Sequence, residues 1–340
     1  MTLTTSPRRL PAALSRLRLP VISAPMFTVS YPELVLAQCK AGIVGSFPAL
    51  NARPAELLDE WLHLLREALA DHARRDPQAI IGPIAVNQIS HTSNVRLEAD
   101  MRTCVAHQVP VIISSLRAPV KEIVDAVHSY GGIILHDVIS LRHAEKALEA
   151  GVDGIIAVAA GAGGHAGRLS PFALVGELRR MFDGPIALSG ALGTGQAIVA
   201  AQAMGADFAY MGTRFIATQE ANASDAYKAA ILRAGANDIV YSDWFSGVHG
   251  NYLRESITRA GLDPDELPSG DKSRMSFADG RSKAKAWKDI WGAGQGVGQI
   301  DDLPPVATVV DRLEAQYLAT RRHLAAGVFE AERSVACGQN

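Results

Sequence analysis

Short apolar runs recur along the first two thirds of the chain, and most are followed by an amphipathic stretch. These runs lack the alternation of polar and apolar residues that marks a half-exposed strand. They therefore indicate strands covered on both faces, as in a parallel sheet. Eight such runs are present, at residues 21–26, 42–47, 84–88, 111–114, 132–137, 154–159, 186–189 and 208–211.

The stretches between the runs have the period of amphipathic helices. Residues 55–73 place their large apolar side chains on one stripe, with charged residues opposite. Residues 141–150 and 195–204 are followed by Gly151 and Gly205, and glycine often ends a helix because it tolerates a left-handed backbone. The phrases EAGVDGIIAV and AMGADFAYMG thus repeat one unit of helix, glycine stop, acidic turn and buried strand.

Repeated βα units with parallel strands form either a closed barrel or an open doubly wound sheet. Eight such strands within a stretch this short favour the α/β class of (β/α)8 or TIM barrel. We expect the barrel to comprise residues 1–221 and 301–340, with a last helix at 306–325. Residues 222–300 are richer in glycine, tryptophan and polar residues and are expected to form a helical elaboration over the barrel mouth. Its helices are predicted at 225–234 and 282–291; a separate small domain is the alternative.

The composition is that of a soluble globular enzyme, with 340 residues of which 48% are hydrophobic and 20% charged. A formal net charge of −2 gives no reason to expect nucleic acid or an anionic membrane as a partner. Because charged residues, glycine or histidine interrupt every apolar stretch, no segment is predicted to span a bilayer. These features indicate a cytoplasmic protein.

Neither disulfides nor a metal site are indicated. Three cysteines and four histidines lack partners at suitable spacing; they are Cys39, Cys104, Cys337, His91, His107, His128 and His143. The first twenty residues are basic but interrupted by prolines, which favours an N-terminal helix over a targeting signal. The chain also lacks a GxSxG elbow and a Walker loop, which argues against a serine hydrolase or a P-loop NTPase.

The carboxyl ends of the strands carry the functional face of a TIM barrel. In this chain those ends are rich in glycine and small polar residues, which a buried strand end does not need for packing. The residues are Pro25, Met26, Asn87, Ser114, Ser115, His136, Asp137, residues 161–167, Ser189, Gly190, Ala191, Gly212 and Thr213. We therefore expect a ligand site at this end of the barrel.

The loop AAGAGGHAGR after the sixth run is the most specific local signal. Its glycines let the backbone approach a flat or anionic ligand closely. Its histidine, His165, could simply close the loop through hydrogen bonds. Because the flanking glycines leave it few neighbours to pack against, we favour a catalytic role in which it exchanges a proton or donates a hydrogen bond to substrate.

Two neighbouring loops resemble the halves of a phosphate site, which in barrels is commonly built after strands seven and eight. Ser189, Gly190 and Ala191 would form one half, and Gly212 with the hydroxyl of Thr213 the other. The alternative is that the glycines only make tight turns. A further glycine-rich segment, WGAGQGVG at 291–298, is either a loop that folds back over the ligand, with Gln295 as a contact, or a flexible linker.

Taken together, these motifs resemble the nitronate monooxygenase family, once called 2-nitropropane dioxygenases. Its flavin-dependent relatives include FabK-type enoyl-acyl-carrier-protein reductases and NADH:quinone reductases. The likeness covers residues 21–215 and extends to Gly298. The matching residues are Ala24, Pro25 and Met26 (the APM strand end), Asn87, Gly163, Gly164, His165, Ala166 and Gly167 (the GGHxG loop), Gly190 and Ala191 (the phosphate turn), and Met211, Gly212, Thr213, Arg214 and Phe215 (MGTRF).

The resemblance implies a barrel that holds one FMN, with the APM backbone against the isoalloxazine ring and His165 beside it. Two residues depart from the family pattern. Asp137 stands where some relatives carry a lysine, and a carboxylate there would not stabilise a reduced flavin unless it were protonated or turned away. Ala191 replaces the second glycine of the phosphate turn, a change that a backbone N–H donor should tolerate.

The implied reaction is the oxidation of alkyl nitronates, and of nitroalkanes, by O2 to a carbonyl compound and nitrite. His165 would hydrogen-bond the nitro oxygens or act as base on the α-carbon. An alternative on the same fold is an NAD(P)H-dependent reductase of an enoyl thioester or a quinone. A third is a barrel that binds a phosphorylated metabolite without redox work. Barrels of this shape often associate, so a homodimer is compatible with the chain, although no segment specifies one.

Overall fold

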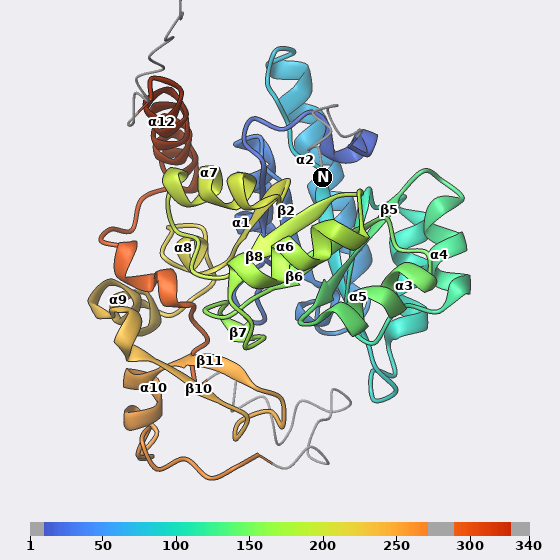
Figure 1. The fold of residues 1–340 in the computed structure, drawn as a ribbon. Helices are drawn as coiled ribbons and strands as arrows, with labels where there is room; N and C mark the ends of the chain where they lie inside the picture. The colour runs from blue at the N-terminus through green and yellow to red at the C-terminus, as the bar shows by residue number, and fades with distance from the viewer. Residues whose placement is uncertain (1–9, 271–288, 328–340) are drawn as a thin grey trace, which may run out of the picture.

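The computed structural model describes residues 10–270 and 289–327. Eight parallel strands form one sheet in the order β1-β9-β8-β6-β5-β4-β3-β2, surrounded by helices (Figure 1). Each strand overlaps one of the eight predicted runs. The strands are β1 (Val21–Ser23), β2 (Gly45–Pro48), β3 (Ile84–Ser90), β4 (Val111–Leu116), β5 (Ile133–Val138), β6 (Gly154–Val158), β8 (Ile186–Ser189) and β9 (Phe208–Met211).

The two end strands of the sheet meet. Ile22 of β1 forms a parallel bridge with Val44, which lies immediately before β2. The Ser23 N–H donates to the Val44 carbonyl at 3.0 Å, and the Val44 N–H donates to the Val21 carbonyl at 3.2 Å. The sheet therefore closes into the predicted (β/α)8 barrel.

The helices of the barrel follow the predicted pattern. The helix predicted at 55–73 is present two residues later, and those predicted at 195–204 and 306–325 have the predicted bounds. Gly205 ends α7 with a φ of +111°, the left-handed backbone expected there. The barrel helices are α1 (Pro32–Lys40), α2 (Leu57–Arg75), α3 (Leu97–Ala106), α4 (Lys121–His128), α5 (Leu141–Glu149), α6 (Pro171–Met181), α7 (Gly195–Met204), α8 (Thr213–Ile216) and α12 (Val306–Ala325).

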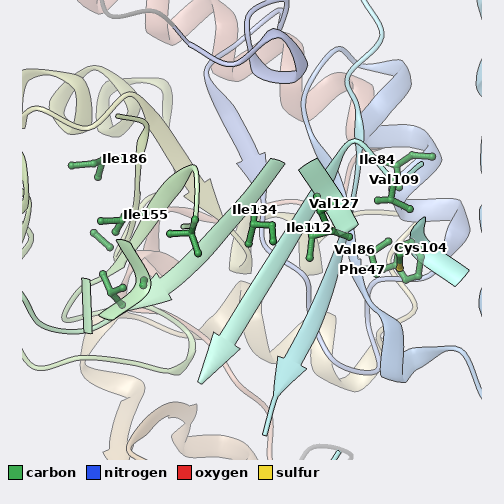
Figure 2. Close-up of a cluster of buried hydrophobic side chains, with 14 of the residues drawn as sticks. Phe47, Ile84, Val86, Cys104, Val109, Ile112, Val127, Ile134, Ile155 and Ile186 are labelled. Carbon is green, nitrogen blue, oxygen red and sulfur yellow. The ribbon is translucent and has the colours of Figure 1, made fainter. Parts of the chain in front are cut away.

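Side-chain alternation along the strands divides the core into two layers. Ile112 and Ile134 point outward and pack with the surrounding helices (Figure 2). Their neighbours Ile113 and Leu135 belong to a separate cluster inside the barrel, together with Leu14 from the N-terminal segment. Two residues beyond Ile113 and Leu135, the inward positions are polar and begin the functional end.

Residues 222–300 were predicted to be helical, but their described part contains strands as well as helices. The helices α9 (Asp225–Arg233) and α10 (Arg254–Arg259) are present, but so are the strands β10 (Ile239–Ser242) and β11 (Gly250–Leu253). These two pair antiparallel, and β11 also pairs with β7 (Gly164–His165) from the loop after β6. We call this three-stranded sheet and the described residues 222–270 and 289–300 the cover; β10 and β11 lie below the barrel in the view of Figure 1.

Two predicted helices need comment. The helix predicted at 282–291 lies almost wholly outside the described residues. The helix predicted within the first twenty residues is wrong for the described part, residues 10–20. These contain only the short 3-10 helix η1 (Ala12–Leu14). Three prolines interrupt the segment, and proline is tolerated only in the first turn of a helix. No helix in the described ranges is long and apolar enough to cross a bilayer.

Candidate active site

A cavity of about 460 Å³ lies at the carboxyl ends of the strands, walled by both the barrel and the cover. This size is typical of small-molecule sites. Much of the wall is backbone, because many of its residues have no side chain beyond a methyl group. These residues are Ala24, Gly161, Ala162, Gly163, Gly164, Ala166, Gly190, Ala191, Gly212, Gly292, Gly294 and Gly296.

The structure brings most of the predicted site residues to this one cavity. They are Ala24, Pro25, Met26, Asn87, Asp137, Gly163, Gly164, His165, Ser189, Gly190, Ala191, Gly212 and Thr213. Met211 and Gln295 are not in the wall. The Met211 side chain packs in a buried apolar cluster, and Gln295 is exposed to solvent.

The barrel side of the cavity carries a chain of polar side chains across three consecutive strands. Asn87, Ser115 and Asp137 each lie two residues beyond an inward apolar residue of β3, β4 and β5, so they too point inward. The Asn87 Nδ2 donates to the Ser115 Oγ at 2.7 Å, and the Ser115 hydroxyl donates to the Asp137 Oδ2 at 2.6 Å. We call these three residues the polar chain.

Their neighbours Ser114 and His136 have the opposite orientation. Both are buried behind the strands, where the Ser114 Oγ lies 2.7 Å from the His136 Nδ1. Burial lowers the pKa of His136 to about 4, with a smaller contribution from His143. The strand-end rule therefore selected the correct strands but could not distinguish the cavity-facing residue from its neighbour.

Asp137 is electrostatically unusual. Burial raises the pKa of its carboxyl group to about 6, although the hydrogen bond from Ser115 lowers it. The other carboxyl oxygen, Oδ1, is buried without a hydrogen-bond partner in the described part of the chain. The negative charge also helps to raise the pKa of Tyr210, an inward residue of β9, beyond the larger effect of burial.

His165 belongs to the cover and not to the barrel wall. Its backbone pairs with Gly250 in the β7–β11 ladder, and its Nε2 lies 2.9 Å from the Ser246 Oγ. Burial lowers its pKa to about 4. The expectation that glycine flanks leave this histidine with few neighbours is wrong, because strand pairing brings it a hydrogen-bonding partner from 81 residues away.

One loop of the expected phosphate site and the loop after β6 contact the segment 291–298. The Gly294 N–H donates to the Thr213 Oγ1 at 2.9 Å, and the Gln295 N–H donates to the Gly161 carbonyl at 2.9 Å. The segment is therefore packed against the cavity loops, as the folded-back interpretation predicts, rather than forming a free linker. Thr213 accepts this bond, which does not use the hydrogen of its own hydroxyl group.

Ala191 adopts a conformation that suits glycine better. Its φ is +55°, in the left-handed region, and its N–H donates to the Gly161 carbonyl at 3.2 Å. The substitution of the family's second glycine by alanine is thus tolerated in this fold. Its backbone N–H, however, donates within the protein, which is not the ligand-facing arrangement expected from the sequence.

Several wall residues were not predicted. Arg53 follows the second strand, so the strand-end rule could have found it, and Tyr210 occupies an inward position of β9. Tyr227, Phe245 and Ser246 come from the cover and give no local signal. Their positions depend on pairing between segments that are distant in sequence.

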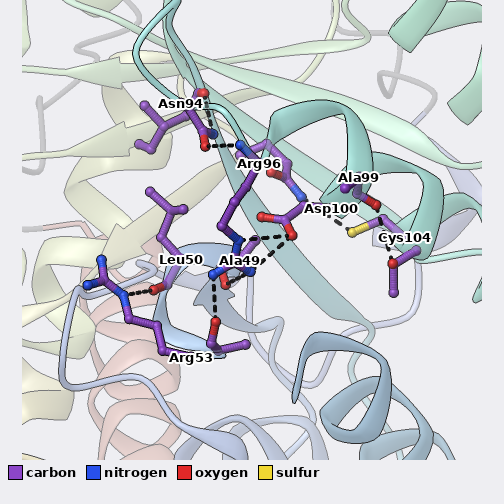
Figure 3. Close-up of polar contacts among 12 residues, drawn as sticks. Ala49, Leu50, Arg53, Asn94, Arg96, Ala99, Asp100 and Cys104 are labelled. Atoms are coloured by element: carbon purple, nitrogen blue, oxygen red, sulfur yellow. Dashed lines mark hydrogen bonds and ion pairs between the residues drawn. The ribbon is translucent and has the colours of Figure 1, made fainter. Parts of the chain in front are cut away.

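The loop that brings Leu50 and Arg53 to the cavity is held by a partly buried ion pair (Figure 3). The Arg96 guanidinium donates to the Ala52 carbonyl at 2.7 Å and to Asp100 Oδ1 at 3.0 Å. A further hydrogen bond reaches the Ala49 carbonyl at 3.3 Å. Arg96 therefore fixes α3 against this part of the cavity rim.

Comparison with known proteins identifies the family. The nitronate monooxygenase family model matches residues 9–316. The chain belongs to this family. It is accordingly an oxidoreductase, built on the TIM barrel described above.

Individual proteins of known name or structure are similar to the chain at modest identity. A nitronate monooxygenase from Paraburkholderia phytofirmans is 27% identical over 344 residues, covering 87% of this chain and 92% of the relative. The solved nitroalkane oxidase from Streptomyces ansochromogenes has a TM-score of 0.78 at 23% identity, covering 92% and 100% of the two chains. A FabK mutant from Thermotoga maritima has a TM-score of 0.69 at 25% identity, covering 95% and 99%.

Proposed function

We propose that this protein oxidises alkyl nitronates, and nitroalkanes, with O2 to a carbonyl compound and nitrite, using one FMN held in the cavity. The observation that carries the proposal is His165 in the wall of a glycine-lined cavity at the carboxyl ends of the barrel strands. Membership of the nitronate monooxygenase family supports it. Flavin binding and the substrate are inferences from these two facts.

The residues present fit a flat phosphorylated ligand. The backbone of Ala24–Met26 and the glycines around His165 offer a surface with few side chains, against which a ring system would lie. Gly190, Gly212 and the Thr213 hydroxyl would hold the phosphate. When bound, FMN would supply the redox chemistry, while the protein sets orientation, access and charge.

His165 would act in its neutral form, because burial lowers its pKa to about 4. The Ser246 hydroxyl donates its one hydrogen to the Val248 carbonyl at 2.9 Å. With that hydrogen bond in place, the tautomer that also satisfies Ser246 carries its proton on the His165 Nε2. In this neutral form His165 would accept the α-proton of a neutral nitroalkane. A nitronate, which has already lost this proton, would need His165 only for orientation.

The remaining wall suits the alkyl part of such a substrate. Apolar side chains from both the barrel loops and the cover line the cavity, and they favour a carbon chain over a strongly solvated group. They are Phe27, Val29, Leu50, Ile89, Leu116, Ile139, Phe245 and Val248.

Parallel assays of the purified protein with nitronate in air and with NADH under nitrogen test the function. We expect the visible absorption of bound oxidised flavin, and nitrite release from nitronate without rapid bleaching by NADH. Rapid bleaching by NADH without nitronate turnover would identify the alternative, an NAD(P)H-dependent flavin reductase, which the likeness to FabK favours. Absence of flavin absorption even after FMN is added would overturn both.

Replacing His165 separates its two roles. In His165→Asn we expect nitroalkane turnover to fall roughly 100-fold at pH 7, because general-base catalysis contributes about that much or more. Nitronate turnover should fall much less, since no proton is removed from carbon. Steady-state rates with the two substrate forms provide the measurement. Ser246→Ala, which removes only the hydroxyl partner of His165, is the matched control and should lose less than the His165 variant. Nitroalkane turnover equal to wild type would remove His165 from the mechanism.

A further inference from the structure

Asp137 is the one carboxyl side chain in the wall of the cavity, as far as the described residues define that wall. The proposed reaction brings negative charge into this cavity, as a nitronate or as a reduced flavin. A fixed carboxylate beside that charge would oppose it, because like charges in a poorly solvated site repel strongly. The surroundings of Asp137 indicate how this conflict is resolved.

The direction of the polar chain determines which oxygen of Asp137 can carry a proton. The Asn87 side-chain amide nitrogen can only donate, so the Ser115 oxygen accepts at 2.7 Å. The single Ser115 hydrogen then points to the Asp137 Oδ2 at 2.6 Å. Oδ2 is therefore an acceptor in both charge states, and an added proton resides on Oδ1, the buried oxygen without a partner.

The other groups around the cavity do not neutralise this carboxylate. Its opposite residue on β6 is Ile156, which is apolar. No ion pair joins Asp137 to a cation in the described ranges. The remaining titratable side chains of the wall are Arg53, with its guanidinium 5.3 Å from the centre of the Phe27 ring, and His143, His165, Tyr210 and Tyr227.

Burial keeps three of these groups uncharged at pH 7. It lowers the pKa of His165 to about 4 and raises the pKa of both Tyr210 and Tyr227. Burial also raises the pKa of Asp137 to about 6, which is close to neutral pH before any anion enters the cavity. A nearby negative charge raises that affinity further.

We propose that Asp137 is a charge-regulating residue, which takes up one proton on Oδ1 whenever negative charge enters the cavity. The inference rests on the proposed flavin function. The proton comes from solvent or buffer acid, one O–H bond forms at Oδ1, and no electron passes to or from Asp137. In this way the chain tolerates an aspartate at a position where a permanent negative charge would hinder reduction of the flavin.

The test is the reduction potential of the bound flavin as a function of pH, measured against a reference dye in wild type and Asp137→Asn. Asparagine has the same shape and can still accept from Ser115, but it is neutral at every pH. Above about pH 6 we expect the variant to become progressively easier to reduce than wild type, up to about tenfold for each unit by which reduction raises the pKa of Asp137. The difference should vanish at lower pH, where wild-type Asp137 is protonated.

Infrared difference spectra of the same proteins detect the proton directly. Reduction of the wild type should produce the carbonyl band of a protonated carboxylic acid, and Asp137→Asn should lack it. His165→Asn is the matched control and should keep both the band and the pH break. If Asp137→Asn folds poorly, Ser115→Ala replaces it; losing a donor to Oδ2 should move the break to higher pH.

The outcomes distinguish the two proposals. Potential curves of wild type and Asp137→Asn that superimpose at all pH values, with flavin bound in both, would overturn the role of Asp137 and leave the proposed function intact. A carboxylic acid band that persists in Asp137→Asn would do the same. A wild-type protein that binds no flavin would overturn the proposed function and this inference together.

Discussion

The two walls of the cavity are built in different ways. On the barrel side, Asn87, Ser115 and Asp137 lie on neighbouring strands, and their hydrogen bonds span 28 and 22 residues of sequence. On the cover side, His165 lies on a strand of two residues, and its partner Ser246 is 81 residues away. The barrel wall is fixed by regular strand register, whereas the cover wall depends on pairings between segments that are distant in sequence.

The electrostatic environment differs as well. On both walls a buried titratable group is shifted towards its neutral form, but the two shifts have opposite signs in pKa. The barrel carries an acid that becomes harder to ionise, and the cover carries a base that becomes harder to protonate. Burial therefore favours the neutral forms of both Asp137 and His165, one on each wall of the cavity.

The largest expected effect lies in the barrel. Arg96→Met should lower the free energy of unfolding by about 3–4 kcal/mol, because it leaves the buried Asp100 carboxylate without its cation. Asp100 is 2% exposed, and the loops at Ala49 and Ala52 lose their donor. Urea unfolding of this variant and of Arg96→Met/Asp100→Asn gives the measurement. The double variant should recover part of the loss, and a single-variant loss below about 1 kcal/mol would contradict the role of Arg96.

The pH dependence of stability should separate the two walls. The pKa of His165 is lowered from 6.5 to about 4, so the unfolded chain binds a proton first, and stability is lost as pH falls from 6.5 towards 4. The pKa of Asp137 is raised from 3.8 to about 6, so the folded chain binds a proton first, and stability is lost as pH rises from 3.8 through 6. Each effect amounts to about 3 kcal/mol.

Two variants measure these opposite slopes against wild type. Asp137→Asn should gain stability relative to wild type near pH 7, and the gain should disappear towards pH 4. His165→Asn should show its relative gain near pH 4 and none at pH 7. Denaturant unfolding across this range provides the data, and equal slopes for the two variants would contradict the assignment of either pKa.

A smaller effect is expected from crowding the cover pairing. A Cβ added at Gly250 would lie 2.8 Å from the Gly164 carbonyl oxygen, so Gly250→Ala should push β7 and β11 apart. We expect a loss of about 1–2 kcal/mol and faster amide exchange in β7 and β11, with barrel strands unchanged. Gly176→Ala in α6, where an added Cβ meets nothing within 4 Å, is the matched control. Uniform acceleration throughout the barrel would show that the cover is not a separate cooperative unit.

This contrast also explains how much could be predicted from the sequence. Strands buried on both faces leave continuous apolar runs, so all eight barrel strands were recognised. The inward positions of Asn87 and Asp137 follow from two-residue alternation once the strands are known. The strand β7 could not be recognised, because two residues are too few to show an alternation of polar and apolar side chains, and one of them is Gly164, which has no side chain. The same limit concealed Ser246, and with it the polar neighbour of His165.

Because β7 pairs with β11, His165 belongs to the cover and not to the eight-stranded barrel. Substitutions in the cover strands can therefore change the reach and angle of the imidazole without altering any residue of the barrel. The position of the imidazole therefore depends on residues 239–253, which lie outside the eight-stranded sheet.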